Sequence, residues 1–178
     1  MKLFLKIIII FFYSFSISAV DNVETEISTD NGIEVYQNEK FYLLKKNVKI
    51  KSESFSLNAN DVKVNFNESL YDITELNANG DVDFKSVIFN MEGNGELLRF
   101  EVKNEKLKIE GIGSKIITED IEMFSDGFIK VNNLNGKFSL KGENSKLINQ
   151  NVLIIGESID GIFSNNQDTK EISILNVK

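Results

Sequence analysis

Residues 47–66 read "NVKIKSESFSLNANDVKVNF", and residues 81–100 read "DVDFKSVIFNMEGNGELLRF". At this constant offset of 34 residues, identical residues recur along the stretch. The identical pairs are Val48 and Val82, Lys51 and Lys85, Ser52 and Ser86, Phe55 and Phe89, Asn60 and Asn94, and Phe66 and Phe100. Such self-similarity indicates an internal duplication, which is typical of proteins built from stacked structural repeats.

The duplicated stretch alternates apolar and polar residues with a period of two. Val48 and Ile50, for example, alternate with Lys49 and Lys51. This period is that of a half-buried β-strand. Helical spacing is scarce beyond residue 20, because Gly, Asn and β-branched residues interrupt most windows. We therefore predict an all-β, largely antiparallel fold made of similar modules along one stack.

Asn-Gly and Asp-Gly dipeptides punctuate the strands. They occur at residues 31–32, 79–80, 94–95, 126–127 and 135–136. These residue pairs accept the positive φ angles of tight reversals between antiparallel strands. We predict a strand reversal at each of them.

The composition argues against most kinds of active site. The 178 residues include no Cys and no His, which excludes disulfides, thiol nucleophiles and the usual zinc ligand sets. Gly-rich phosphate loops, nucleophile elbows and metal-ligand spacings are also missing from the sequence. An enzyme would have to use Asp, Glu, Lys or Tyr without a convergent motif, so we expect no enzymatic activity, no cofactor and no metal.

The N-terminal residues predict export. A short basic segment precedes an apolar stretch, Ile7–Val20, in which small residues lead up to Ala19. This pattern predicts a secretory signal peptide over residues 1–19, cleaved near Ala19. The alternative is a retained membrane anchor, although the uninterrupted apolar run is shorter than the roughly 18 to 20 residues of a spanning helix. Residues 20–178 contain no linker and are expected to form a single domain.

The charge makes nucleic acid an unsuitable partner. Removal of residues 1–19 deletes two lysines and takes the formal charge from -7 to -9, whereas nucleic-acid binding requires a basic surface. Contact with lipid phosphates is one interpretation of the lysine cluster at residues 45–51. Because Lys49 and Lys51 alternate with apolar residues, a solvated strand face is the preferred interpretation.

Apolar side chains of the duplicated units are predicted to face one interior. The set is Ile50, Phe55, Leu57, Val64, Phe66, Phe84, Phe89, Met91, Leu98 and Phe100. Two uses remain open, an ordinary packed core or a groove between two β layers that takes acyl chains. Each buried CH₂ group contributes about 0.8 kcal/mol, so a carrier that passes lipid onward requires a partly open groove.

The two ends of such a stack present unpaired backbone groups. Edge strands invite pairing with another chain unless loops, Lys side chains or bulges cover them, and the sequence contains no Pro to block them. End-to-end assembly by strand addition and covered edges both remain possible at this point.

Short motifs over residues 27–100 resemble a known family. Residues 46–48 read "KNV", residues 57–62 read "LNANDV" and residues 73–82 read "ITELNANGDV". In order and spacing these resemble the steps of the OstA-like (LptA) family of periplasmic lipopolysaccharide-transport proteins. Lys46 and Asp81 replace the Gly and Asn of the family pattern, and the resemblance is looser from residue 101 onward.

The resemblance implies a fold and a role. It implies a twisted β-jelly-roll of repeated antiparallel strands, open at both ends, whose interior takes the lipid A acyl chains of lipopolysaccharide. It further implies a periplasmic bridge from the inner to the outer membrane, with end-to-end contacts to LptC-like and LptD-like proteins and to further copies of the chain. The alternatives are an LptC-like membrane-anchored subunit of the same pathway and an exported structural β-repeat protein without a lipid ligand.

Overall fold

The computed structural model describes residues 25–166 and 169–178. The predicted signal peptide, residues 1–19, lies outside these residues. The described chain forms thirteen β-strands joined in one antiparallel sheet, which confirms the predicted all-β, jelly-roll class. Within the described ranges, no helix is long and apolar enough to cross a membrane.

The strands vary from three to fifteen residues in length. In chain order they are β1 (Glu26–Ser28), β2 (Ile33–Tyr36), β3 (Phe41–Lys51), β4 (Phe55–Phe66), β5 (Ile73–Ser86), β6 (Met91–Glu101), β7 (Lys106–Glu110), β8 (Ser114–Thr118), β9 (Ile121–Ser125), β10 (Phe128–Asn132), β11 (Lys137–Asn149), β12 (Val152–Asn166) and β13 (Thr169–Val177).

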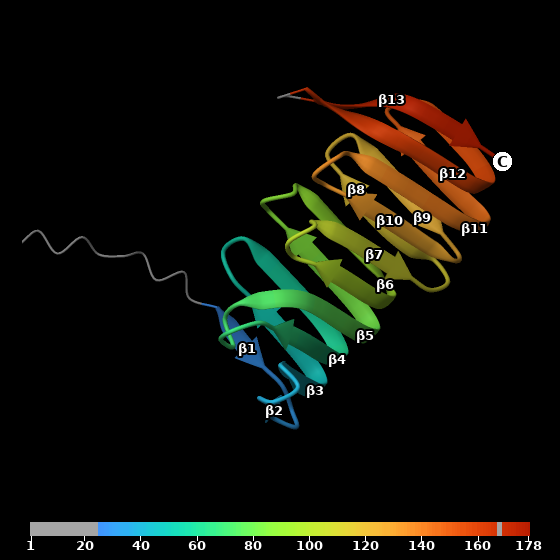
Figure 1. Ribbon diagram of the computed structural model, residues 1–178. Coiled ribbons are helices and arrows are strands. Elements are labelled where there is room, and N and C mark those ends of the chain that lie inside the picture. Colours follow the sequence, from blue (N-terminus) through green and yellow to red (C-terminus); the bar gives the residue numbers. More distant parts are fainter. Residues whose placement is uncertain (1–24, 167–168) are drawn as a thin grey trace, which may run out of the picture.

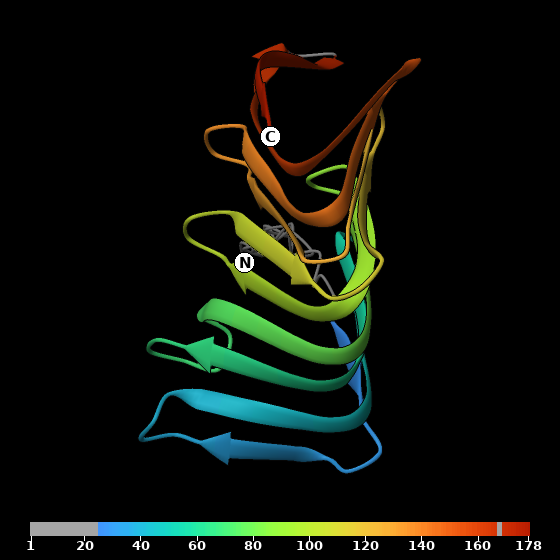
Figure 2. The same ribbon diagram turned by 90° about the vertical axis from the view of Figure 1, so that its right-hand side faces the viewer.

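The long strands bend near their middle, so that each contributes to two walls (Figure 2). Shifts of the pairing register mark the bends, as between Lys45 and Val48 in β3 and between Lys141 and Ser145 in β11. Where the chain leaves the sheet at the bend, two short strands replace one long strand. Thus β7 pairs with the second half of β6 while β8 pairs with the first half.

We call the two walls wall A and wall B. Wall A comprises β2, residues 41–45, 61–66, 73–79 and 97–101, β7, β10, residues 137–141 and 158–166, and β13. Wall B comprises β1, residues 48–51, 55–58, 82–86 and 91–95, β8, β9, and residues 145–149 and 152–156. The layers follow one another from the N-terminal to the C-terminal end, with the bends on the right in Figure 1 and hairpin turns on the left.

Most of the Asn-Gly and Asp-Gly dipeptides lie at bends, so the prediction of a strand reversal at each of them was wrong. Residues 79–80 and 94–95 lie inside β5 and β6, and residues 31–32 and 126–127 join strands of opposite walls. Only residues 135–136 form a hairpin turn. A bulge and a reversal both favour residues that accept a positive φ, and Gly80 has a φ of 76°.

An apolar ladder runs along the inner face of wall A through every layer from β3 to β12. Its members lie opposite one another in successive strands and are at most 3% exposed. They are Leu44, Val62, Ala78, Leu98, Ile109, Ile129, Leu140 and Ile159. Each layer therefore buries its inner face against the layers before and after it, as in other stacked repeats.

Wall B carries a matching inner row. Its residues again lie opposite one another from strand to strand, and they are Leu57, Phe84, Gly93, Ile116, Met123 and Leu147. A Cβ at Gly93 would come within 2.8 Å of the Phe84 ring, so the glycine makes room for the aromatic side chain. The two inner rows face each other and form one continuous core.

The close approach of neighbouring bends makes Gly127 difficult to replace. A Cβ at Gly127 would collide with the backbone carbonyl oxygen of Lys141. We expect Gly127→Ala to lower the free energy of unfolding by at least about 2 kcal/mol, since the backbone must shift. Gly113→Ala is the control, because Gly113 has a φ of 71° and open space around it, and its cost should be about 1 kcal/mol. Urea denaturation measures both; equal losses would contradict the steric explanation.

Candidate functional site

The ten residues predicted to line an interior all belong to the core or pack against it. Six are buried, namely Leu57, Val64, Phe66, Phe84, Met91 and Leu98. Four are half-buried, namely Ile50, Phe55, Phe89 and Phe100. The structure thus brings the whole predicted set together in one apolar interior, while its contact with lipid stays a proposal.

The set contributes to both walls, and one aromatic pair bridges them. Phe89 lies in the turn between β5 and β6, at the tip of wall B, and Phe100 projects inward from wall A. Their ring centroids are 5.9 Å apart in an edge-to-face arrangement. The two walls therefore touch through side chains at the side away from the bends.

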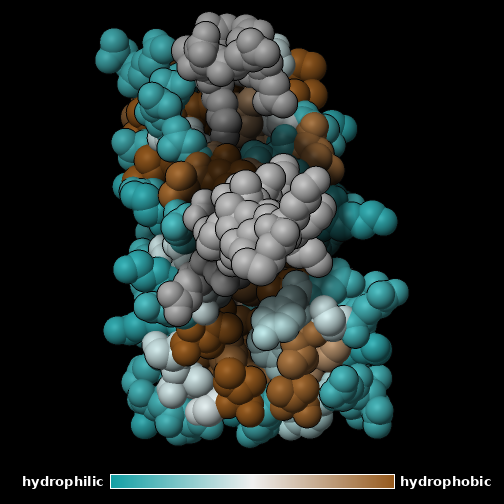
Figure 3. Space-filling view, turned by 90° about the vertical axis from the view of Figure 1, so that its left-hand side faces the viewer, coloured by the Kyte–Doolittle hydropathy of each residue, from teal (hydrophilic) through white to brown (hydrophobic). Residues whose placement is uncertain are grey.

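We call the side on which the hairpin turns of both walls lie the mouth. Figure 3 looks onto this side and shows apolar surface above and below the part drawn in grey, between polar flanks. Among the described strands, no backbone ladder joins one wall to the other at the mouth, because each strand segment pairs with segments of the same wall. Within residues 25–166 and 169–178, the covalent connections between the two walls all lie at the bends.

The turns at the mouth carry exposed apolar side chains that were not predicted from the sequence. Tyr71 is 92% exposed and Ile88 is 71% exposed, in positions where turns normally carry polar residues. The full set in these turns is Leu70, Tyr71, Val87, Ile88, Val102 and Leu134. The available signal was the break in alternation at "SVIFN", residues 86–90.

The interior also extends through the C-terminal half, beyond the predicted set. Ile109, Met123 and Leu147 are fully buried there and continue the inner rows. The alternation of residues 128–132 and 137–140 was the signal for this part of the interior. This alternation did not lead to a prediction of interior residues, because the repeat identities fade after residue 100.

The polar groups at the interior serve the backbone. Ser125 Oγ donates to the carbonyl of Lys141 over 2.7 Å, and Ser145 Oγ donates to the carbonyl of Gly142 over 2.9 Å. Burial raises the pKa of the Tyr42 hydroxyl. Among the described side chains none of the buried ones is charged, and most of them are apolar.

A comparison with solved structures identifies a similar fold. The chain resembles the crystal structure of LptH, the LptA-homologous periplasmic component of the conserved lipopolysaccharide transport device from Pseudomonas aeruginosa. The TM-score is 0.52 at 10% sequence identity, and the match covers 87% of this chain and 95% of that chain. No family model and no curated protein matches the sequence. The chain therefore has an LptA-like fold.

The contact between Phe89 and Phe100 can be measured in solution. A double-mutant cycle with Phe89→Ala and Phe100→Ala should give a coupling energy of about 1 kcal/mol, since edge-to-face pairs contribute 0.5–1.5 kcal/mol beyond burial. Phe89→Ala combined with Phe138→Ala is the control. Phe138 instead stacks on Phe163, so this second pair of changes should be additive. Additivity in the first cycle would mean that the walls do not meet at the mouth.

Proposed function

We propose that this protein is a periplasmic lipopolysaccharide-binding carrier and forms part of a bridge that moves lipopolysaccharide from the inner to the outer membrane. One observation carries the proposal. An apolar interior runs through the stacked layers and reaches a mouth whose turns expose large apolar side chains. The LptA-like fold supports it, since LptH is a periplasmic lipopolysaccharide-transport component.

The lipid enters through the mouth. Acyl chains insert between the walls by displacing side-chain contacts such as that between Phe89 and Phe100, and no backbone ladder has to break, because each ladder lies within one wall. Each CH₂ group that leaves water contributes about 0.8 kcal/mol. The carrier is passive and non-enzymatic, and another component of the pathway drives the direction of movement.

Copies of the chain, and LptC-like and LptD-like partners, join the bridge end to end. The inner rows of wall A end in exposed residues, Ile33 and Val35 at one end and Leu175 and Val177 at the other. Four strand segments have one unpaired side within the described residues, namely β1, β2, β13 and the first half of β12. Strand addition at these edges continues both the sheet and its apolar interior.

An exported structural β-repeat protein is the second candidate. It is favoured by the tight packing of the inner rows, where Leu44, Ile109 and Leu140 are fully buried, as in an ordinary core. An LptC-like subunit differs from the carrier in keeping its N-terminal segment as an anchor. Mass spectrometry of the protein purified from its native envelope decides among the three, through bound lipid and through cleavage near Ala19.

A charge at the mouth should strongly weaken lipid capture. We expect Phe55→Asp and Phe89→Asp each to weaken binding of lipid A by the purified protein at least tenfold, because a carboxylate among acyl chains loses its hydration. Fluorescent displacement of a lipid probe measures the affinity, and far-UV circular dichroism verifies the fold.

Phe124→Asp is the matched control. Phe124 is half-buried on the outer face of wall B, beside Lys115, so this variant should bind lipid A normally. If the Phe55 and Phe89 variants keep their fold and still capture lipid A normally, the proposal that acyl chains bind between the walls is contradicted.

Charges at the exposed end of the inner rows should prevent self-association. We expect the wild-type protein to associate as its concentration rises and the double variant Ile33→Lys/Val35→Lys to stay monomeric, since lysines there would be buried without partners. Sedimentation velocity measures the association. Ile112→Lys is the control, because Ile112 is 81% exposed at a bend rather than at an end. Equal behaviour of the two variants would count against end-to-end assembly.

A further inference from the structure

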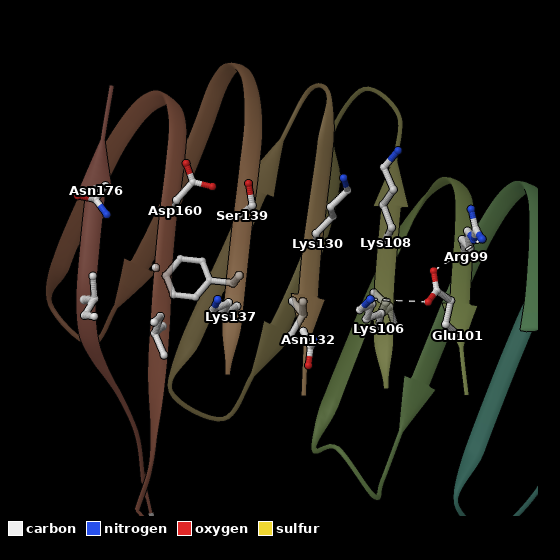
Figure 4. Close-up of a pocket in the computed structure, with 16 residues that line it drawn as sticks. Arg99, Glu101, Lys106, Lys108, Lys130, Asn132, Lys137, Ser139, Asp160 and Asn176 are labelled. Atoms are coloured by element: carbon white, nitrogen blue, oxygen red, sulfur yellow. Dashed lines mark ion pairs between the residues drawn. The ribbon is translucent and has the colours of Figure 1, made fainter. Parts of the chain in front are cut away.

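The outer face of wall A carries a hollow of about 710 Å³ that faces away from the apolar interior. Its lining comes from β6, β7, β10, β11, β12 and β13. One row of labelled side chains crosses these strands in Figure 4. In order, each opposite the next, they are Arg99, Lys108, Lys130, Ser139, Asp160 and Asn176.

The lining of the hollow is positively charged, whereas the protein as a whole is negatively charged. The chain as a whole carries a formal charge of -7. The lining nevertheless contains five cationic residues, Arg99, Lys106, Lys108, Lys130 and Lys137, against two acidic residues, Glu101 and Asp160. A concave surface with an excess of one sign of charge concentrates ligands of the opposite sign.

Cationic side chains lie opposite one another on neighbouring strands of this row. Arg99 lies directly opposite Lys108, and Lys108 lies directly opposite Lys130, although like charges in such positions destabilise a sheet. The Phe128 ring holds the two ammonium groups together, with its centroid 5.1 Å from Lys108 Nζ and 4.7 Å from Lys130 Nζ. This ring attracts both cations without neutralising them.

Part of the positive charge is left available to a ligand. Glu75 and Glu101 pair with Arg99 at 2.8 and 3.6 Å, and Glu110 pairs with Lys108. Among the side chains that the structure describes, no carboxylate pairs with Lys130 or Lys137. Both lysines are exposed.

We propose that this hollow binds a segment of an acidic polysaccharide. Neighbouring strands lie about 4.8 Å apart, so the row from Arg99 to Lys130 spans about 10 Å, enough for more than one anionic group. Asn132, Ser139 and Asn176 lie in the same hollow and can hydrogen-bond sugar hydroxyls. The volume falls within the range of ligand sites, about 300–1,000 Å³, and a single inorganic anion would use little of it.

The test uses sucrose octasulfate as a small anionic saccharide, with sucrose and inorganic sulfate as the comparison probes. Isothermal titration calorimetry on the whole protein should detect sucrose octasulfate binding that weakens as salt increases. Sucrose should not bind, and sulfate should bind at least 100-fold more weakly. The double variant Lys108→Gln/Lys130→Gln should lower the affinity at least tenfold. The control, Lys49→Gln/Lys51→Gln, removes the same charge from exposed positions in wall B and should change nothing.

Several results would overturn the proposal. These are the absence of octasulfate binding, equal losses in the two double variants, and sulfate binding as strong as that of the octasulfate. Displacement of bound octasulfate by lipid A would assign the hollow to a lipid headgroup and overturn the assignment to a polysaccharide. The proposal does not depend on the interior, so the Lys108→Gln/Lys130→Gln variant should capture lipid A normally.

Discussion

The structure depends on the long strands bending at the same level in successive layers. If one layer bent elsewhere, its inner residues would no longer lie opposite those of its neighbours, and both apolar ladders would be interrupted. Residues with positive φ, such as Asn47 and Gly80, make the corners. Buried serines, such as Ser125 and Ser145, line them and satisfy carbonyl groups that leave the ladder. Two facing walls follow from this one constraint.

The strands and the inner set were predictable because a β-strand offers only two environments. A period of two therefore identifies the inner face without knowledge of the pairing, as it did for Leu57, Phe84 and Leu98. The bends were not predictable, since Asn79-Gly80 has the same chemistry in a bulge as in a hairpin turn. The basic row was missed because Arg99, Lys108 and Lys130 become neighbours only through the register of three strands.

Each strand of wall A has two different faces. In β7, Ile109 belongs to the apolar ladder while Lys108 belongs to the basic row. The inner face follows from the need of each layer to cover the next, so its residues are constrained by packing. The outer face has no such constraint, and several of its charged side chains are held by ion pairs, such as that of Lys108 with Glu110, rather than by packing. The same alternation thus gives one wall two faces of different chemistry, an apolar inner face and a charged outer face.

The order of pairing has a consequence for how the chain reaches its native state. Strands pair with strands that precede or follow them closely, from β1 and β3 at one end to β12 and β13 at the other. Contacts of short sequence separation cost little loop-closure entropy and favour rapid folding. A chain synthesised from its N-terminus can thus add one strand after another to the growing sheet. At each step the apolar inner face of the last layer added is the part that the next layer has still to cover.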